Sequence, residues 1–194
     1  MPESNDRLTD LGQFYEILHR LDKTIGGSHR LTECSGKMPW PSHGVYFFFE
    51  DGEVRSDSGV GPRVVRVGTH ALTATSRTTL WNRLSQHRGV TKTGAGNHRG
   101  SIFRLIVGEA LSKRAPSFGV ETWGQGQSAI AAVRATEVEH ERRVSDYIRA
   151  MPFVWLRVSD DGGGPALRAL IERNSIALLS NYERSHLIYL LLIG

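Results

Sequence analysis

The chain has 194 residues, a formal net charge of +4 and one cysteine, which suits a single domain with a buried core. Cys34 alone excludes an internal disulfide, and no apolar run approaches the about 20 residues that a membrane-spanning helix requires. The sequence also lacks zinc-type Cys/His clusters, nucleotide-binding phosphate loops and Gly-x-Ser-x-Gly elbows, which argues against zinc fingers, ATPases and hydrolases built on that elbow. No secretory signal layout is present, so we expect a cytoplasmic protein with no membrane partner.

Apolar residues recur at helical spacing near the start of the chain and stop at Gly26 and Gly27. They are Leu8, Leu11, Phe14, Tyr15, Leu18, Leu21 and Ile25. This pattern predicts an amphipathic helix. With the connector that follows, the helix makes up segment 1–40, and it either packs on the main domain or forms a dimer contact.

Two apolar runs, 45–49 and 64–68, are rich in β-branched and aromatic residues and predict buried strands. The segments between them, 50–53 and 58–62, are dense in turn-forming residues. The two strands therefore most simply pair as a hairpin with a long loop. This pairing places Tyr46 and Gly68 on neighbouring strands.

A helix is expected over residues 80–87, with Thr78 or Thr79 as its N-cap. Arg83 and His87 are four residues apart and share one face of this helix. Both side chains can therefore address a single phosphate group.

The segment from Arg83 to Arg114 carries seven basic residues against one acid, Glu109. Within it, residues 94–101 predict a loop whose backbone could approach phosphates closely. The expected nucleic-acid-binding side chains are Arg88, Lys92, His98, Arg99 and Arg104.

A second long helix is expected over residues 129–149. Its glutamates, Glu137, Glu139 and Glu141, alternate with arginines, which is typical of a solvated face with paired charges. These glutamates are a rival source of a metal-binding carboxylate, with Glu139 the first of them.

Residues 153–158 predict a third strand, which the turn-forming segment 159–165 ends. A helix over 166–179 follows and carries Glu172 among its leucines and isoleucines. A carboxylate there suits Mg²⁺ or Mn²⁺, because these ions prefer oxygen ligands. The remaining segment, 182–194, is largely apolar.

The order of these elements resembles the GIY-YIG nuclease superfamily, in particular its restriction-endonuclease members. The family is marked by two tripeptide motifs on neighbouring strands. Their counterparts here are Gly44-Val45-Tyr46 and Arg66-Val67-Gly68. The resemblance implies an α+β fold: a small three-stranded antiparallel sheet flanked by helices, with an insertion and an N-terminal helix. The nuclease domain would span 41–181, with a basic insertion at about 88–128.

The resemblance also implies roles in a single-metal hydrolysis of DNA. Tyr46 would be the general base, and Arg83 would stabilise charge on the scissile phosphate. His87 would orient the nucleophile or relay its proton, and Glu172 would hold the metal ion.

Three further residues belong to the expected site. Arg66 stands where the family usually has tyrosine, and it can contact phosphate but cannot replace a phenol. His70 follows the second motif closely. The family also has an asparagine after its metal-binding glutamate. In this sequence it corresponds to Asn181 or, less well, to Asn174.

Two functions therefore remain in view. One is a divalent-metal-dependent DNA endonuclease, of restriction type and acting as a homodimer. The other is a catalytically degenerate module that keeps the fold and binds nucleic acid.

Overall fold

The structure is a computed structural model that describes residues 4–72, 76–159 and 167–180. Asn181 and segment 182–194 lie outside the described residues. None of the described helices is long and apolar enough to cross a membrane.

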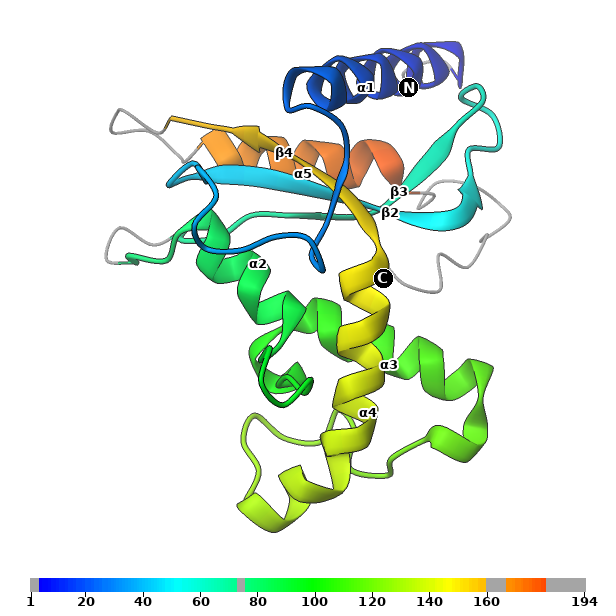
Figure 1. Cartoon of the computed structure of the whole chain (residues 1–194). Helices are drawn as coiled ribbons and strands as arrows, with labels where there is room; N and C mark the ends of the chain where they lie inside the picture. The colour runs from blue at the N-terminus through cyan, green and yellow to red at the C-terminus, as the bar shows by residue number, and fades with distance from the viewer. Residues whose placement is uncertain (1–3, 73–75, 160–166, 181–194) are drawn as a thin grey trace.

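The centre of the molecule is an antiparallel sheet with strand order β1-β4-β2-β3 (Figure 1). Strands β2 (Gly44–Val54), β3 (Pro62–Gly68) and β4 (Pro152–Arg157) are the three strands expected from the sequence. The two-residue strand β1 (His29–Arg30) adds a fourth at the edge by pairing with β4. It was not predicted because two residues carry no periodicity. The α+β fold with a helix-flanked sheet is confirmed.

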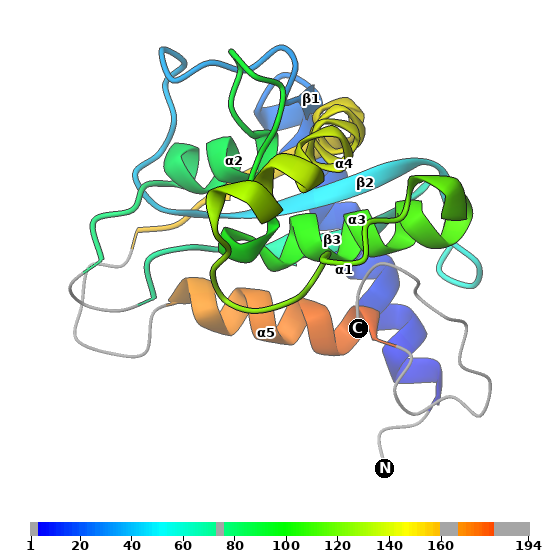
Figure 2. The same ribbon diagram turned by 90° about the horizontal axis from the view of Figure 1, so that it is seen from below.

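Helices cover both faces of this sheet, which explains why β2 is buried continuously at its start rather than at alternate residues. Helices α1 (Ser4–Thr24) and α5 (Leu167–Leu179) cover one face, where Val45 and Phe47 point. Helices α2 (Leu80–Arg88), α3 (Ile102–Arg114) and α4 (Ala131–Ala150) cover the other, where Tyr46 and Phe48 point. Figure 2 shows α5 and α1 together on the side of the sheet away from α4.

Helix boundaries follow the expected local signals. The side chain of Thr79 caps α2 by accepting a hydrogen bond from Asn82 N at 3.2 Å. After α1, Gly26 and Gly27 take positive φ values of 85° and 108°, which glycine adopts without steric cost. Tyr15 and Leu18 of α1 are buried against the sheet, so this helix packs on the domain.

The segment expected as an insertion, 88–128, combines helices with irregular connections. It holds α3 and the short 3₁₀ helices η1 (His98–Gly100) and η2 (Pro116–Phe118), and α3 packs against α4. Figure 1 shows α3 and α4 extending below the sheet, away from α1.

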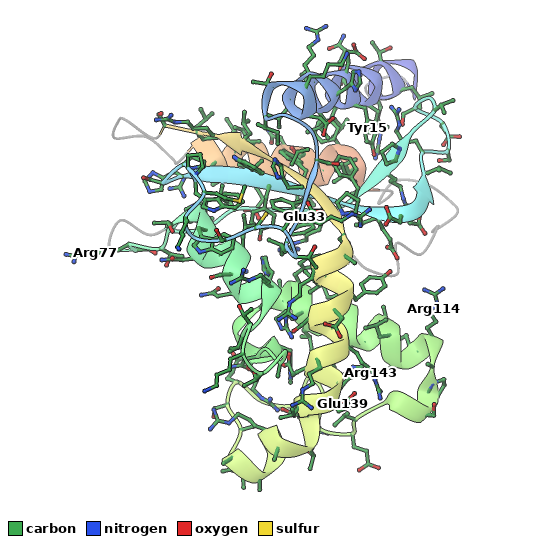
Figure 3. All side chains as sticks on the ribbon, in the orientation of Figure 1. Tyr15, Glu33, Arg77, Arg114, Glu139 and Arg143 are labelled. Atoms are coloured by element: carbon green, nitrogen blue, oxygen red, sulfur yellow. The ribbon has the colours of Figure 1, made fainter. Side chains whose placement is uncertain are left out.

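The predicted solvated face of the second long helix is wrong for two of its three glutamates. Glu137 and Glu141 of α4 are buried, because each pairs with an arginine of the insertion. Only Glu139 behaves as expected: its side chain is 62% exposed and lies near Arg142 and Arg143. Figure 3 labels Glu139 and Arg143 on the outer part of α4.

Candidate active site

The phenol of Tyr46 lies directly over Gly68 of the neighbouring strand. The two residues are paired in the antiparallel register of β2 and β3, so they share one face of the sheet. A Cβ atom at position 68 would lie 2.3 Å from the Tyr46 hydroxyl oxygen, which no side chain could tolerate. Glycine at this position therefore leaves the space that the phenol occupies.

A chain of three polar side chains begins at this phenol. The Tyr46 hydroxyl oxygen lies 2.7 Å from Nε2 of His87, and Nδ1 of His87 lies 2.8 Å from Oγ of Ser101. Tyr46 and His87 are both 0% exposed, and Ser101 is also buried. The strand β2, the helix α2 and the start of α3 each supply one member of this chain.

Two arginines act on the same phenol. Arg66 lies opposite Phe48 in the register, which puts it on the Tyr46 face of the sheet, and Arg83 lies one turn before His87 on α2. Arg83 Nη1 also donates to Gln86 Oε1 at 3.0 Å and to the Gly100 carbonyl at 3.3 Å. These bonds tie the guanidinium to the start of the insertion.

Burial and charge oppose each other at Tyr46. Burial raises the pKa of the phenol above its ordinary value, while the charges of Arg66 and Arg83 and a hydrogen bond with Arg83 reduce that rise. The negative charge of Glu172 raises the pKa of Tyr46 by a smaller amount, so this carboxylate lies close enough to influence the phenol.

The surroundings of His87 favour its neutral imidazole form. Burial lowers the pKa of its imidazole well below the ordinary value, and the charges of Arg83, Arg66 and Arg104 lower it further. Three permanent cations around a buried ring disfavour the imidazolium form.

Glu172 reaches the end of strand β3 from helix α5. Its Oε1 accepts a hydrogen bond from Thr69 N at 3.2 Å, and the Thr69 hydroxyl donates to the Gly44 carbonyl at 2.8 Å. One turn earlier on α5, Arg168 donates to the backbone carbonyls of His70 and Ala71. Helix α5 therefore holds the segment that follows the second strand motif.

Glu172 could offer a carboxylate oxygen to a divalent metal ion. Among the described residues, no three His, Cys, Asp or Glu side chains are grouped to hold a metal ion. One carboxylate is enough for Mg²⁺, which usually keeps several waters and binds phosphate oxygens. Glu172 fits this pattern, because Thr69 N–H holds one oxygen while the other can bind a cation.

His70 lies beside this centre in the connection from β3 to α2. Its Nδ1 lies 2.8 Å from the Thr78 carbonyl, so Nδ1 carries the proton, because a carbonyl only accepts. Burial, helped by the charges of Arg168 and Arg83 and opposed by the hydrogen bond with Thr78, lowers the pKa of His70 to about 4. Within the described residues its buried Nε2 has no hydrogen-bond partner.

Most of the expected nucleic-acid-binding side chains are engaged inside the protein. Arg104 is fully buried and bonds to Glu141, to Ser145 Oγ at 3.0 Å and to the His87 carbonyl at 2.7 Å. His98 is buried against the same Glu141, with its Nδ1 at 3.0 Å from Oε1. Both residues were expected to contact DNA, and in this structure their side chains are buried against Glu141 of α4.

Arg99 and Arg88 also have internal partners. Arg99 makes two hydrogen bonds to the Glu137 carboxylate, at 2.6 and 2.8 Å, and its side chain is 5% exposed. Arg88 lies over the Trp81 ring and donates to the Cys34 carbonyl at 2.9 Å. Lys92 alone of the five is exposed.

Sequence reasoning named Glu141 as a rival metal-binding carboxylate and placed Ser101 in the 94–101 loop, but it missed the contacts that both residues make. Ser101 had a visible local signal, because a serine before an apolar helical stretch is a favoured N-cap, and its side chain does accept from Arg104 N at 3.3 Å. Its contact with His87 and the Glu141 pairing carry no such signal, since the partners are far apart in sequence.

Comparison with known proteins supplies a family. A family model described as a GIY-YIG domain matches residues 5–188, and no curated protein and no solved structure matches the chain.

Proposed function

Because the chain belongs to the GIY-YIG domain family, whose members are generally nucleases, we propose that it is a divalent-metal-dependent endonuclease that hydrolyses DNA phosphodiester bonds. The observation that supports this most is the electrostatic convergence on Tyr46. Two arginines and the Glu172 carboxylate all act on its phenol, and they come from β3, α2 and α5. A domain that needed only its fold would not require these charges to meet at one hydroxyl.

Tyr46 acts as the general base in this proposal. Its phenolate oxygen takes a proton from the attacking water as the new oxygen–phosphorus bond forms and the bond to the leaving oxygen breaks. The phenol first releases its own proton to solvent. Burial opposes this ionisation, and the charges of Arg66 and Arg83 favour it.

Arg83 and Arg66 stabilise negative charge in this proposal. The planar fork of each guanidinium group matches phosphate oxygens well. Arg83 addresses the scissile phosphate. Arg66, which replaces the family's usual tyrosine, supplies a second cation where other members place a hydroxyl.

Glu172 is the proposed metal ligand, for Mg²⁺ or Mn²⁺. A bound ion would stabilise charge on the phosphate and on the leaving oxygen. The backbone N–H of Thr69 orients the carboxylate for this role. Asn181 lies outside the described residues, and its role stays part of the proposal.

A specific observation favours the alternative, a catalytically degenerate nucleic-acid-binding module. Tyr46 and His87 are 0% exposed, so a phosphate can reach the phenol only if neighbouring side chains move. In that alternative the Tyr46–His87–Ser101 chain would only stabilise the core.

Restriction-type activity belongs to the same proposal. The helical insertion between α2 and α4 supports it, because it enlarges the small nuclease core beside the site. Cutting both strands of a symmetric duplex requires two active sites, hence a homodimer. Linear plasmid formed without an accumulated nicked form would support this mode, and nicking alone would contradict it.

The decisive experiment is cleavage of supercoiled plasmid with Mg²⁺, Mn²⁺ or EDTA. We expect metal-dependent cleavage that Tyr46→Phe and Glu172→Gln each reduce by about 100-fold or more, since each removes a group that acts in the transition state. Glu139→Gln, which alters an exposed glutamate, is the matched control and should cleave normally. Salt-dependent DNA binding by a folded protein without cleavage would establish the binding module instead.

A further inference from the structure

A small polar cleft lies beside Arg83, between α2 and the insertion. Its volume is about 290 Å³, and its walls come from α2, η1, the start of α3 and the loop 124–127. Arg83 stands in one wall, and its Nη1 donates to the carbonyl of Gly100 in the next wall at 3.3 Å. Ser101, which contacts His87, also lines the cleft. The cleft therefore adjoins the candidate active site.

Buried contacts hold the loop wall of this cleft in place. Gly124 N–H donates to His98 Nε2 at 3.3 Å, and the Trp123 ring stacks on the His98 imidazole with the ring centroids 3.9 Å apart. The buried side chain of Arg99 donates to the Gln125 carbonyl at 3.2 Å. The buried residues of the insertion thus fix the wall in position, as a preformed binding site requires.

The charge in the cleft is positive. None of the described residues that line it is an aspartate or a glutamate. Glu109 lies near Gly124 but is not part of the lining. The charge of Arg99 is compensated by Glu137, whereas Arg83 makes no ion pair within the described residues and bonds to neutral groups. An uncompensated cation in a concave site attracts anions.

The loop wall also allows a ligand to approach the backbone closely. Gly124 and Gly126 take positive φ values of 79° and 69°, a conformation that favours glycine, so neither position presents a side chain. The exposed Gln127 beside them carries an amide that can donate hydrogen bonds. A cation, an amide donor and accessible backbone are the groups that proteins use to bind DNA phosphates.

We propose that this cleft binds a backbone phosphate of the DNA strand next to the scissile phosphate. Arg83 then lies between two neighbouring phosphates, the scissile one at Tyr46 and the flanking one in the cleft. The identity of the scissile phosphate rests on the proposed nuclease function, whereas DNA binding in the cleft does not. The insertion contributes to substrate binding through this cleft, although most of its arginines are engaged inside the protein.

The first test places a negative charge in the cleft. Ile102 lines it, is 53% exposed and begins α3, where an acidic residue favours the helix, so Ile102→Glu should fold. We expect Ile102→Glu to bind duplex DNA at least about 10-fold more weakly than Ile102→Gln, which has nearly the same shape without the charge. Fluorescence anisotropy of a fluorescein-labelled duplex in EDTA, which prevents metal-dependent cleavage, measures both. Ile17→Glu, exposed on α1, is the control for net charge and should bind like the wild-type protein.

The second test locates the phosphate. Phosphates beside the mapped cut are replaced one at a time by an uncharged methylphosphonate. Replacing the phosphate that occupies the cleft should weaken binding by the wild-type protein about 10-fold. The same replacement should change binding by Ile102→Glu less than about twofold, because that variant has already lost the contact.

Equal affinities of Ile102→Glu and Ile102→Gln would overturn the proposal. An equal loss in Ile17→Glu would also overturn it, since net charge would then be the cause, as would methylphosphonates that affect the wild-type protein and Ile102→Glu equally. If Ile102→Glu does not fold, Gln127→Glu on the exposed loop wall is compared with the wild-type protein in the same way. Weakened DNA binding by Ile102→Glu in a protein that cuts no DNA would refute the nuclease function while supporting the cleft.

Discussion

Arg66 stands where the resemblance expects a tyrosine, and its position gives this departure a physical meaning. It lies on the same sheet face as Tyr46, and its charge is the leading influence that favours the ionised phenol. A second cation stands where the resemblance expects a second phenol, so we expect charge rather than a hydroxyl donor to assist Tyr46.

We expect Arg66→Ala to raise the pKa of Tyr46 and to lower kcat/KM near neutral pH by about 10- to 100-fold, a loss of about 1.4–2.7 kcal/mol of transition-state stabilisation. The ascending, acidic limb of the pH–rate profile, which reports ionisation of the base, should move to higher pH. Arg63→Ala, on the same strand but paired with Glu53, is the control. An unchanged profile in Arg66→Ala would show that this arginine does not act on the base.

Position 68 requires glycine because the Tyr46 phenol occupies the space where a side chain would lie. Alanine there would place Cβ 2.3 Å from the Tyr46 hydroxyl oxygen, so we expect Gly68→Ala to displace the phenol from His87. Overpacking of this kind costs about 1–3 kcal/mol of unfolding free energy, measurable by urea denaturation, and cleavage should be lost. Gly12→Ala is the control, because its Cβ would meet no atom within 4 Å and alanine favours the α1 helix.

At the scale of elements, α3 and α4 are joined by a buried ion pair that also reaches the active centre. Arg104 bonds to Glu141 of α4 and to the carbonyl of His87, and Glu141 also accepts from His98 N at 2.6 Å. A buried pair of this kind adds little net stability, but removing one partner leaves the other charge uncompensated.

We therefore expect Glu141→Gln to lower the free energy of unfolding by about 3–5 kcal/mol, because the Arg104 cation would remain buried without its counter-charge. Glu139→Gln on the same helix should change it by less than about 0.5 kcal/mol, since that carboxylate is exposed. Urea unfolding followed by tryptophan fluorescence measures both. Equal small effects would mean that the pair is solvated in solution.

At the scale of the whole molecule, several buried histidines make stability depend on pH. Burial lowers the pKa of His70, His87 and His140 in the folded protein, to about 4 for His70. Between pH about 6.5 and 5 the unfolded chain therefore binds protons that the folded protein does not.

The free energy of unfolding should accordingly fall as the pH is lowered through this window, by up to about 1.4 kcal/mol per pH unit for each such proton. His70→Gln should reduce the slope, and His19→Gln, exposed on α1, should not. Urea denaturation at pH 7.5, 6.5, 5.5 and 5.0 measures it. A slope that His70→Gln leaves unchanged would place His70 in contact with solvent.

DNA binding also depends on the whole surface. Because Arg88, Arg99 and Arg104 have partners inside the protein, we expect other, exposed basic residues to contact DNA. Arg77 and Lys92 are exposed before and after α2, and Figure 3 shows Arg77 projecting from the body of the molecule. We expect Arg77→Ala and Lys92→Ala each to reduce the salt dependence of DNA binding by about one unit of slope. Arg20→Ala, on the helix across the sheet, should leave the slope unchanged, and fluorescence anisotropy at 50–300 mM salt would measure all three.

The sequence by itself determined most of the elements and their order, but not strand β1 or helix α3. The apolar runs predicted β2, β3 and β4, and Thr79 and the glycines after α1 marked helix ends, because these features depend on neighbouring residues alone. The spacing of Arg83 and His87 and the hairpin that joins Tyr46 to Gly68 were equally local, so the central part of the candidate site could be predicted.

Only the tertiary structure decided which charges are solvated. Arg104 and Glu141 are 37 residues apart, and alternating charges along a helix give no indication that one of them meets a partner from a distant segment. The same holds for Ser101, 14 residues from His87 and joined to it by the packing of α3 against α2. Burial changes the role of such groups, because a charge or hydroxyl removed from water must find its partner inside the fold.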